Sequence, residues 1–298
     1  MNRLRAFIRF SRPHTVIGTT LSICGLYAIA VAHVNPEQFY LDKLIWALLS
    51  CLGANIYIVG LNQLTDVQID RVNKPNLPLA SGEFSMRAGS IINSVALILS
   101  IGIAAWQGRF LFITVMVSLL IGTIYSLPPF RLKRFHFWAA ACIFTIRGLV
   151  VNIFIFLHFN RIFLNAVDFP PQMWALTVFI FGLSLVIAWF KDIPDAEGDR
   201  RFKIMTLTVH LGAEKVFKLG RGLLTVCYLG LIIAGLAGLP RVNQTFLVAT
   251  HIILLIVMWL LSRRVDPAQQ ASMARYYLTI WILFFAEYLI FPTACLLN

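Results

Sequence analysis

The sequence predicts an all-α integral membrane protein in which nine helices cross the bilayer and residues 1–298 form one domain. Two observations support this prediction. Hydrophobic residues make up 59% of the 298 residues and charged residues only 13%, whereas apolar residues are about half of a typical soluble domain. The apolar residues also occur in nine long runs, each close to the ~20 residues that a helix needs to cross a bilayer.

Short polar connections separate the nine apolar runs. In chain order, the predicted helices are 15–34, 44–64, 88–107, 110–127, 136–158, 172–190, 216–238, 243–262 and 276–297. Each run is bounded by charged residues or by Pro and Gly, which interrupt the apolar pattern. The longest connections are 65–87 and 191–215. In the second, Pro194 and Gly198 indicate that the sixth helix ends or becomes irregular.

Lys and Arg residues are distributed unevenly between the two sides of the predicted bundle. Lys43, Arg109, Arg161 and Arg241 lie on the side opposite the N-terminus, and Arg147 lies inside the fifth run. All other Lys and Arg residues lie on the N-terminal side. Because cytoplasmic loops carry an excess of Lys and Arg, we expect the N-terminus and both long connections to be cytoplasmic.

Composition also bears on partners and location. The net charge of +12 is explained by topology, so no nucleic-acid partner is expected. The five cysteines lie far apart in apolar runs and are expected to pack rather than bind metal. Histidines other than His14 are expected at loops or interfaces. The N-terminal segment MNRLRAFIRFSRPHT lacks the Ser-rich composition of an organelle transit peptide. This favours a bacterial protein, more narrowly a cyanobacterial one, in a plasma or thylakoid membrane.

Two groups of acidic residues occupy the long connections. In NQLTDVQIDRVNKP, residues 62–75, Asn62, Asp66 and Asp70 recur every four residues. On a helix, four residues advance by about 6 Å and turn by about 40°, so these three side chains would form one stripe. The second group lies in KDIPDAEGDRRFK, residues 191–203.

The two segments share one pattern, which indicates that two halves of the chain present matching sites to one cavity. Both contain acid-x-x-x-acid-base-x-x-base, with Asp66, Asp70, Arg71 and Lys74 in the first and Asp195, Asp199, Arg200 and Lys203 in the second. Crowded carboxylates repel one another unless a cation neutralises them. Their hard oxygens suit Mg²⁺, which also binds phosphate oxygens. With bases nearby, the pattern predicts a magnesium and diphosphate site beside apolar spans that hold a lipid tail.

Three other interpretations of the acidic groups stay open from these residues alone. Acidic residues in a loop are most often solvated surface, although the repeated spacing argues against this here. A cation-coupled transporter would place its acids near the middle of the membrane, at broken helices, rather than at the ends of spans. A lipid-binding scaffold would have the same cavity but would catalyse no reaction.

Several segments resemble a known family. NQLTDVQIDRVNKPNLPLASG and KDIPDAEGDRRFKIMTL are similar to the two aspartate-rich motifs of the UbiA superfamily of membrane prenyltransferases. The segments SRPHTVIGTT, YSLPPFRLKR and TIRGLVVN resemble its homogentisate prenyltransferase branch. The resemblance covers nearly the whole chain. It implies a bundle of nine helices around a central cavity that opens sideways to the bilayer.

The resemblance also implies a function. Members of this branch transfer a prenyl group, here expected to be phytyl, from its diphosphate to homogentisate with loss of CO₂, as in tocopherol synthesis. The expected partners are therefore a prenyl diphosphate, homogentisate and the lipid bilayer, with Mg²⁺ as cofactor. Homogentisate solanesyltransferases, chlorophyll synthases and quinone-pathway enzymes share the acidic motifs and are the alternatives.

By the same resemblance, individual residues have expected roles. The expected metal ligands are Asn62, Asp66, Asp70, Asp192, Asp195 and Asp199, of which Asp66, Asp70, Asp195 and Asp199 are also expected to be catalytic. The segment YSLPPFRLKR matches a loop that binds diphosphate. The expected contacts to diphosphate or acceptor are Asn62, Arg71, Lys74, Tyr125, Arg131, Lys133 and His14.

Arg147 is a cation inside the fifth predicted span. A charged side chain within a bilayer is costly and is a functional candidate by default. We therefore expect Arg147 to act in catalysis, by holding the acceptor's carboxylate or the diphosphate. The alternative is a structural pair with an acid of the site or with Glu287 in the ninth span.

Overall fold

The computed structural model describes residues 3–202 and 204–298. Nine helical runs within these residues are long and apolar enough to cross a membrane, which confirms the predicted number. They are α2 (Pro13–Val34), α3 (Leu41–Thr65), α5 (Met86–Gln107), α6 (Arg109–Ser126), the run α7–η2–α8 (His136–Leu164), α9 (Pro171–Arg201), α11 (Ala213–Leu236), α12 (Gln244–Ser262) and α13 (Gln270–Leu296).

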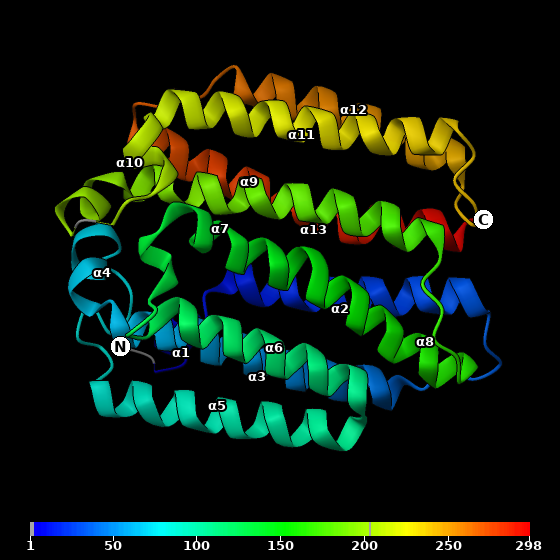
Figure 1. Ribbon diagram of the computed structural model, residues 1–298, viewed down its shortest axis with the longest axis horizontal. Coiled ribbons are helices and arrows are strands. Elements are labelled where there is room, and N and C mark those ends of the chain that lie inside the picture. Colours follow the sequence, from blue (N-terminus) through cyan, green and yellow to red (C-terminus); the bar gives the residue numbers. More distant parts are fainter. Residues whose placement is uncertain (1–2, 203) are drawn as a thin grey trace.

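The long helices lie side by side and roughly parallel (Figure 1). Helices α11 and α12 form one side of the bundle in this view, and α5 forms the other. The short helices α1 (Arg3–Phe10), α4 (Val67–Asn73) and α10 (Leu207–Leu211) gather at the end that holds the N-terminus, and the C-terminus lies at the opposite end. We call the end with α4 and α10 the polar end, because both long polar connections lie there.

Apolar side chains fill the interior of the bundle and also cover its outside. Phe179, Phe190 and Tyr288 are almost completely buried between helices, whereas Ile98 and Leu236 leave 69% and 72% of their surface exposed. Extensive exposed apolar surface is rare on soluble monomers and marks contact with a membrane or a partner. The outer surface therefore fits lipid, as the composition predicts.

Helix α9 extends farther than predicted, so the prediction that it ends or becomes irregular near Pro194 and Gly198 is wrong. A Pro inside a helix removes one backbone hydrogen bond, but the neighbouring chain supports this part of the helix. Gln270 Nε2 donates to the carbonyl oxygen of Pro194 at 2.7 Å. A Cβ atom at Gly198 would lie 2.0 Å from Asn73 Oδ1, so Gly at this position lets α9 pack directly against the end of α4.

The stripe of Asn62, Asp66 and Asp70 does not lie on one continuous helix, as the four-residue spacing predicted. Helix α3 ends at Thr65, and Asp66 has φ −117° and ψ 18° before α4 begins. Asn62 Nδ2 nevertheless donates to Asp66 Oδ2 at 3.0 Å. The break at Asp66 lets α4 pack on α9 while the acidic side chains stay together.

Candidate active site

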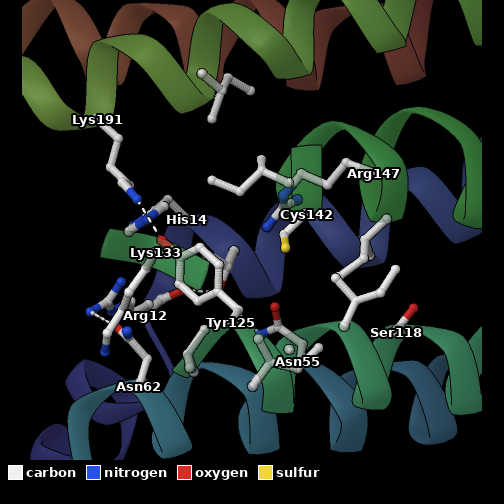
Figure 2. A pocket seen from close by; sticks show the side chains of 18 of the residues that line it. Arg12, His14, Asn55, Asn62, Ser118, Tyr125, Lys133, Cys142, Arg147 and Lys191 are labelled. Carbon is white, nitrogen blue, oxygen red and sulfur yellow. Dashed lines mark hydrogen bonds between the residues drawn. The ribbon is translucent and has the colours of Figure 1, made fainter. Parts of the chain in front are cut away.

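A cavity extends between α2, α3, α6, the α7–η2–α8 run, α9 and α13 (Figure 2). At the polar end its walls carry acidic and basic side chains, and farther along the bundle they are apolar and aromatic. Most of the side chains predicted for the site line it: His14, Asn62, Asp66, Asp70, Lys74, Tyr125, Lys133, Arg147, Asp192, Asp195 and Asp199. The acids of both sequence segments therefore face one chamber.

Asp66 is held by two basic side chains of the segment that follows α6. Arg131 Nη2 donates to Asp66 Oδ1 at 3.0 Å, and Lys133 Nζ donates to Asp66 Oδ2 at 2.5 Å. The short helix η1 (Leu132–Arg134) buries Lys133 and leaves Arg134 exposed. Burial lowers the pKa of Lys133 to about 8, although the Asp66 carboxylate opposes this shift. Arg131 does not line the cavity itself but reaches Asp66 from its edge.

The two acidic segments adjoin each other directly. Lys74 Nζ, in the first segment, forms an ion pair with Asp195 Oδ2, in the second. Asp70 is 5% exposed, and its Oδ2 atom has no hydrogen-bond partner among the residues that the structure describes. The pKa of Asp70 is raised to about 6, mainly by burial; the cations of Arg12 and Lys74 oppose this shift, and the carboxylates of Asp66 and Asp195 contribute to it.

Lys191 is a site residue that sequence reasoning missed. Its Nζ donates to the Tyr125 hydroxyl at 2.8 Å and lies 3.4 Å from Asp192 Oδ1. The sequence did contain a signal, because Lys191 precedes Asp195 by four residues and therefore shares its face of α9. Arg12 is a second such residue, since it lines the cavity and its Nη2 donates to Asn62 Oδ1 at 3.2 Å.

The structure does not bring Arg71 into the cavity. Arg71 is exposed and lines a separate groove together with Arg131 and Arg134. Asp70 and Arg71 are adjacent on α4, and one residue turns a helix by about 100°, so the two side chains cannot share a face. Arg200 is exposed for the same reason, and Lys203 lies outside the described residues.

The carboxylates of the cavity fit Mg²⁺ in their chemistry, but not as a complete set of ligands. Among the described residues, no group of three or more His, Cys, Asp and Glu side chains could hold a metal ion by itself. Mg²⁺ is commonly bound by one or two carboxylates together with water and substrate phosphate oxygens. The unpartnered Oδ2 atom of Asp70 is suited to such a shared site.

Among the described residues, neither an acid of the site nor Glu287 forms an ion pair with Arg147. Its guanidinium lies over the ring of Trp281, 4.7 Å from the ring centre, and 5.8 Å from that of Phe284. Glu287 instead contacts His251, with 3.2 Å between Oε2 and Nε2, and both side chains are completely buried. The expectation that His251 lies in a loop or at an interface is therefore wrong.

Comparison with known proteins agrees with this geometry. The model of the UbiA prenyltransferase family matches residues 21–285 of this chain. A homogentisate phytyltransferase of Synechocystis is 48% identical over 302 residues, which cover 99% of this chain and 96% of that protein. Homogentisate phytyltransferase 1 of Arabidopsis thaliana is 42% identical over 294 residues, with 97% and 75% covered. A UbiA homolog from Archaeoglobus fulgidus, bound to GPP and Mg²⁺, shares the fold with a TM-score of 0.67 and 21% identity, over 97% of this chain and 99% of that one. The chain therefore belongs to the UbiA prenyltransferase family.

Proposed function

We propose that this protein transfers a phytyl group from phytyl diphosphate to homogentisate, with loss of CO₂, as a step of tocopherol synthesis. The observation that carries this proposal is the cavity, in which two acidic groups from separate parts of the chain face one polar chamber that continues into an apolar one. The names of the Synechocystis and Arabidopsis relatives support the choice of donor and acceptor. The identity of the prenyl chain rests on these names alone.

Side chains of the polar end would hold Mg²⁺ and the diphosphate. Their oxygens would ligate the metal together with phosphate oxygens. The side chains that would supply them are Asn62, Asp66, Asp70, Asp192, Asp195 and Asp199. When bound, Mg²⁺ neutralises negative charge on the leaving diphosphate. Lys74, Lys133 and Arg131 would donate hydrogen bonds to the same diphosphate, and Lys191 would orient Tyr125 beside it. Preorganised donors of this kind stabilise the charge that develops on a leaving group.

The apolar part of the cavity has a separate task. Loss of diphosphate leaves an allylic cation on the prenyl chain, which water would quench. Side chains such as Ile146, Val151 and Ile187 line this part and would exclude water, so that the electron-rich ring of the acceptor captures the cation instead. We propose further that residues 1–298 act as one domain, and that the polar end faces the cytoplasm of a bacterium, in its plasma or thylakoid membrane.

The test is a transfer assay in membranes that contain the protein. Homogentisate and Mg²⁺ are supplied with phytyl, geranylgeranyl or solanesyl diphosphate in separate reactions, and the product mass is measured. We expect the phytyl product and no turnover with EDTA. Turnover of 4-hydroxybenzoate or chlorophyllide with none of homogentisate would refute the acceptor and leave the family assignment unchanged.

A transporter and a lipid-binding scaffold are tested by the same assay. The acids lie at the polar end of the bundle, not halfway along the spans, where a transporter has its coupling site. Asp66→Ala and Asp195→Ala should each abolish product, and the unchanged folding of each variant is checked by thermal unfolding. Full transfer by both variants would rule out the proposed site.

A further inference from the structure

We propose that Arg147 binds the carboxylate of the aromatic acceptor and that the rings of Trp281, Phe284 and His14 form the wall beside which the acceptor ring lies. This inference rests on the proposed function and deepens it, because it assigns one subsite of the cavity to the acceptor. It also decides between the two catalytic roles that the sequence leaves open for Arg147.

Arg147 is a cation that still has its hydrogen-bonding capacity. No acidic side chain among the described residues pairs with its guanidinium, which instead lies over the Trp281 ring. No hydrogen bond of the guanidinium to another described residue is present, so its five N–H donors stay available. A carboxylate matches this fork with two parallel hydrogen bonds.

The backbone around Arg147 is built to hold it in place. Arg147 lies in η2 (Thr145–Ile155), a π-helical segment of the fifth span, and such segments are frequent at functional sites. Asn152 Nδ2 donates to the carbonyl oxygens of Arg147 and Gly148, both at 3.0 Å. The Tyr288 hydroxyl donates to Asn152 Oδ1 at 2.7 Å. These buried contacts connect the backbone of Arg147 to α13, the helix that carries Trp281.

The Arg147 subsite lies deeper in the bundle than the acidic groups. Trp281 packs against Gly18 of α2, where a Cβ atom would lie 3.0 Å from the indole ring. Gly18 follows Arg12 by six residues, or roughly 9 Å along the helix, and Arg12 contacts Asn62 at the edge of the acidic region. Figure 2 shows Arg12, Asn62 and Lys133 together, with Arg147 entering the cavity from another helix.

This separation indicates that the diphosphate and the carboxylate of the acceptor bind at different places in the cavity. At the polar end, Lys74, Lys133 and Lys191 already supply cations for a diphosphate. At the deeper level, the Arg147 guanidinium lies against the rings of Trp281 and Phe284. His14, two residues after Arg12, reaches this level through an edge-to-face contact with Trp281, with 4.9 Å between the ring centres. A flat ring with a carboxylate fits this second set, because it can stack on the aromatic wall while its carboxylate meets the guanidinium.

The experiment compares an acid with its amide. Homogentisate and 2,5-dihydroxyphenylacetamide differ in the charged group that Arg147 would bind. Calorimetry on purified wild type, Arg147→Gln, Arg147→Lys and Arg161→Gln measures the affinity for each compound, and kinetics give KM for homogentisate and for the prenyl diphosphate. Arg161 is an exposed arginine of α8, in the same helical run, and therefore serves as the matched control.

We expect Arg147→Gln to weaken homogentisate binding about 10- to 100-fold, the usual effect of losing hydrogen bonds to a charged group. Its affinity for the amide and its KM for the prenyl diphosphate should stay unchanged. Arg147→Lys should recover part of the loss, and Arg161→Gln should match wild type. Equal weakening of acid and amide, a change confined to the prenyl diphosphate, or no change would each overturn the inference.

Failure of the proposed function gives a different result. Wild type would then transfer nothing to homogentisate, whatever Arg147 does. If it accepts 4-hydroxybenzoate instead, the same acid and amide comparison with that compound tests Arg147 directly. If wild type binds no aromatic acid at all, the inference fails as well.

Discussion

Replacing Asp70 by Asn should make the protein more stable while it abolishes prenyl transfer. Asp70 is 5% exposed, and one of its oxygens has no hydrogen-bond partner among the described residues. An ionised carboxylate in such a place is costly, because burial removes its hydration. Asn keeps the shape of the side chain and removes the charge.

The magnitude follows from the pKa of Asp70, which burial raises from 3.8 to about 6. A raised pKa means that the folded protein favours the neutral acid, so the free energy of unfolding falls as the pH rises from about 4 to about 6 and stays reduced above that. A shift of about two pKa units corresponds to about 3 kcal/mol. The gain from Asn should therefore be about 3 kcal/mol at pH 7.5 and roughly half as large at pH 5.

Thermal unfolding of the purified protein in detergent with EDTA measures this effect. We expect Asp70→Asn to unfold several degrees above wild type at pH 7.5, with a smaller difference at pH 5. Asp42 is exposed, so Asp42→Asn provides the control and should change little at either pH. A lower unfolding temperature for Asp70→Asn at pH 7.5, or a gain that does not depend on pH, would refute the argument.

Three further changes test the packing and the charges around the site. Gly198→Ala should lower stability by about 1–3 kcal/mol, because the new methyl group meets Asn73, and adding Asn73→Ala should recover most of the loss in thermal unfolding. His251→Leu should lower the free energy of unfolding by about 3–5 kcal/mol, because Glu287 stays buried without its partner. Changing both His251 and Glu287 to Leu should lower it much less, as measured by unfolding in denaturant. Lys191→Met should raise KM for the prenyl diphosphate about 10-fold, as measured in the transfer assay, and an unchanged KM would mean that Lys191 is purely structural.

The spans and the inward-facing acids could be predicted from sequence because both depend on local patterns. An apolar run near 20 residues has few alternatives to a membrane helix. Asn62 and Asp66 are four residues apart and form a hydrogen bond even though α3 ends directly before Asp66. In each case the pattern survives small changes in the backbone.

The features that the sequence did not reveal depend on contacts between distant segments. Pro194 is a helix breaker by local preference, yet α9 continues through it because Gln270 and α4 support the helix from outside. The π-helical segment around Arg147 has no known local signature in TIRGLVVN, and its freed carbonyl groups are satisfied by Asn152. The repeated pattern and the resemblance predict Arg71 as a diphosphate contact, but Arg71 follows Asp70 directly, and adjacent residues on a helix point in different directions.

Several charge pairs of the cavity join different segments of the chain, and these pairs make the site a single unit. Lys74 belongs to the first acidic segment but pairs with Asp195 of the second. Lys133 and Arg131 come from the connection after α6 and pair with Asp66. Each pair reduces the repulsion among crowded carboxylates and also joins two parts of the chain that are far apart in sequence. An acid and its cation can therefore both reach a diphosphate only when α4, η1 and α9 are packed together, so the packing of the polar end determines whether the chemistry can occur.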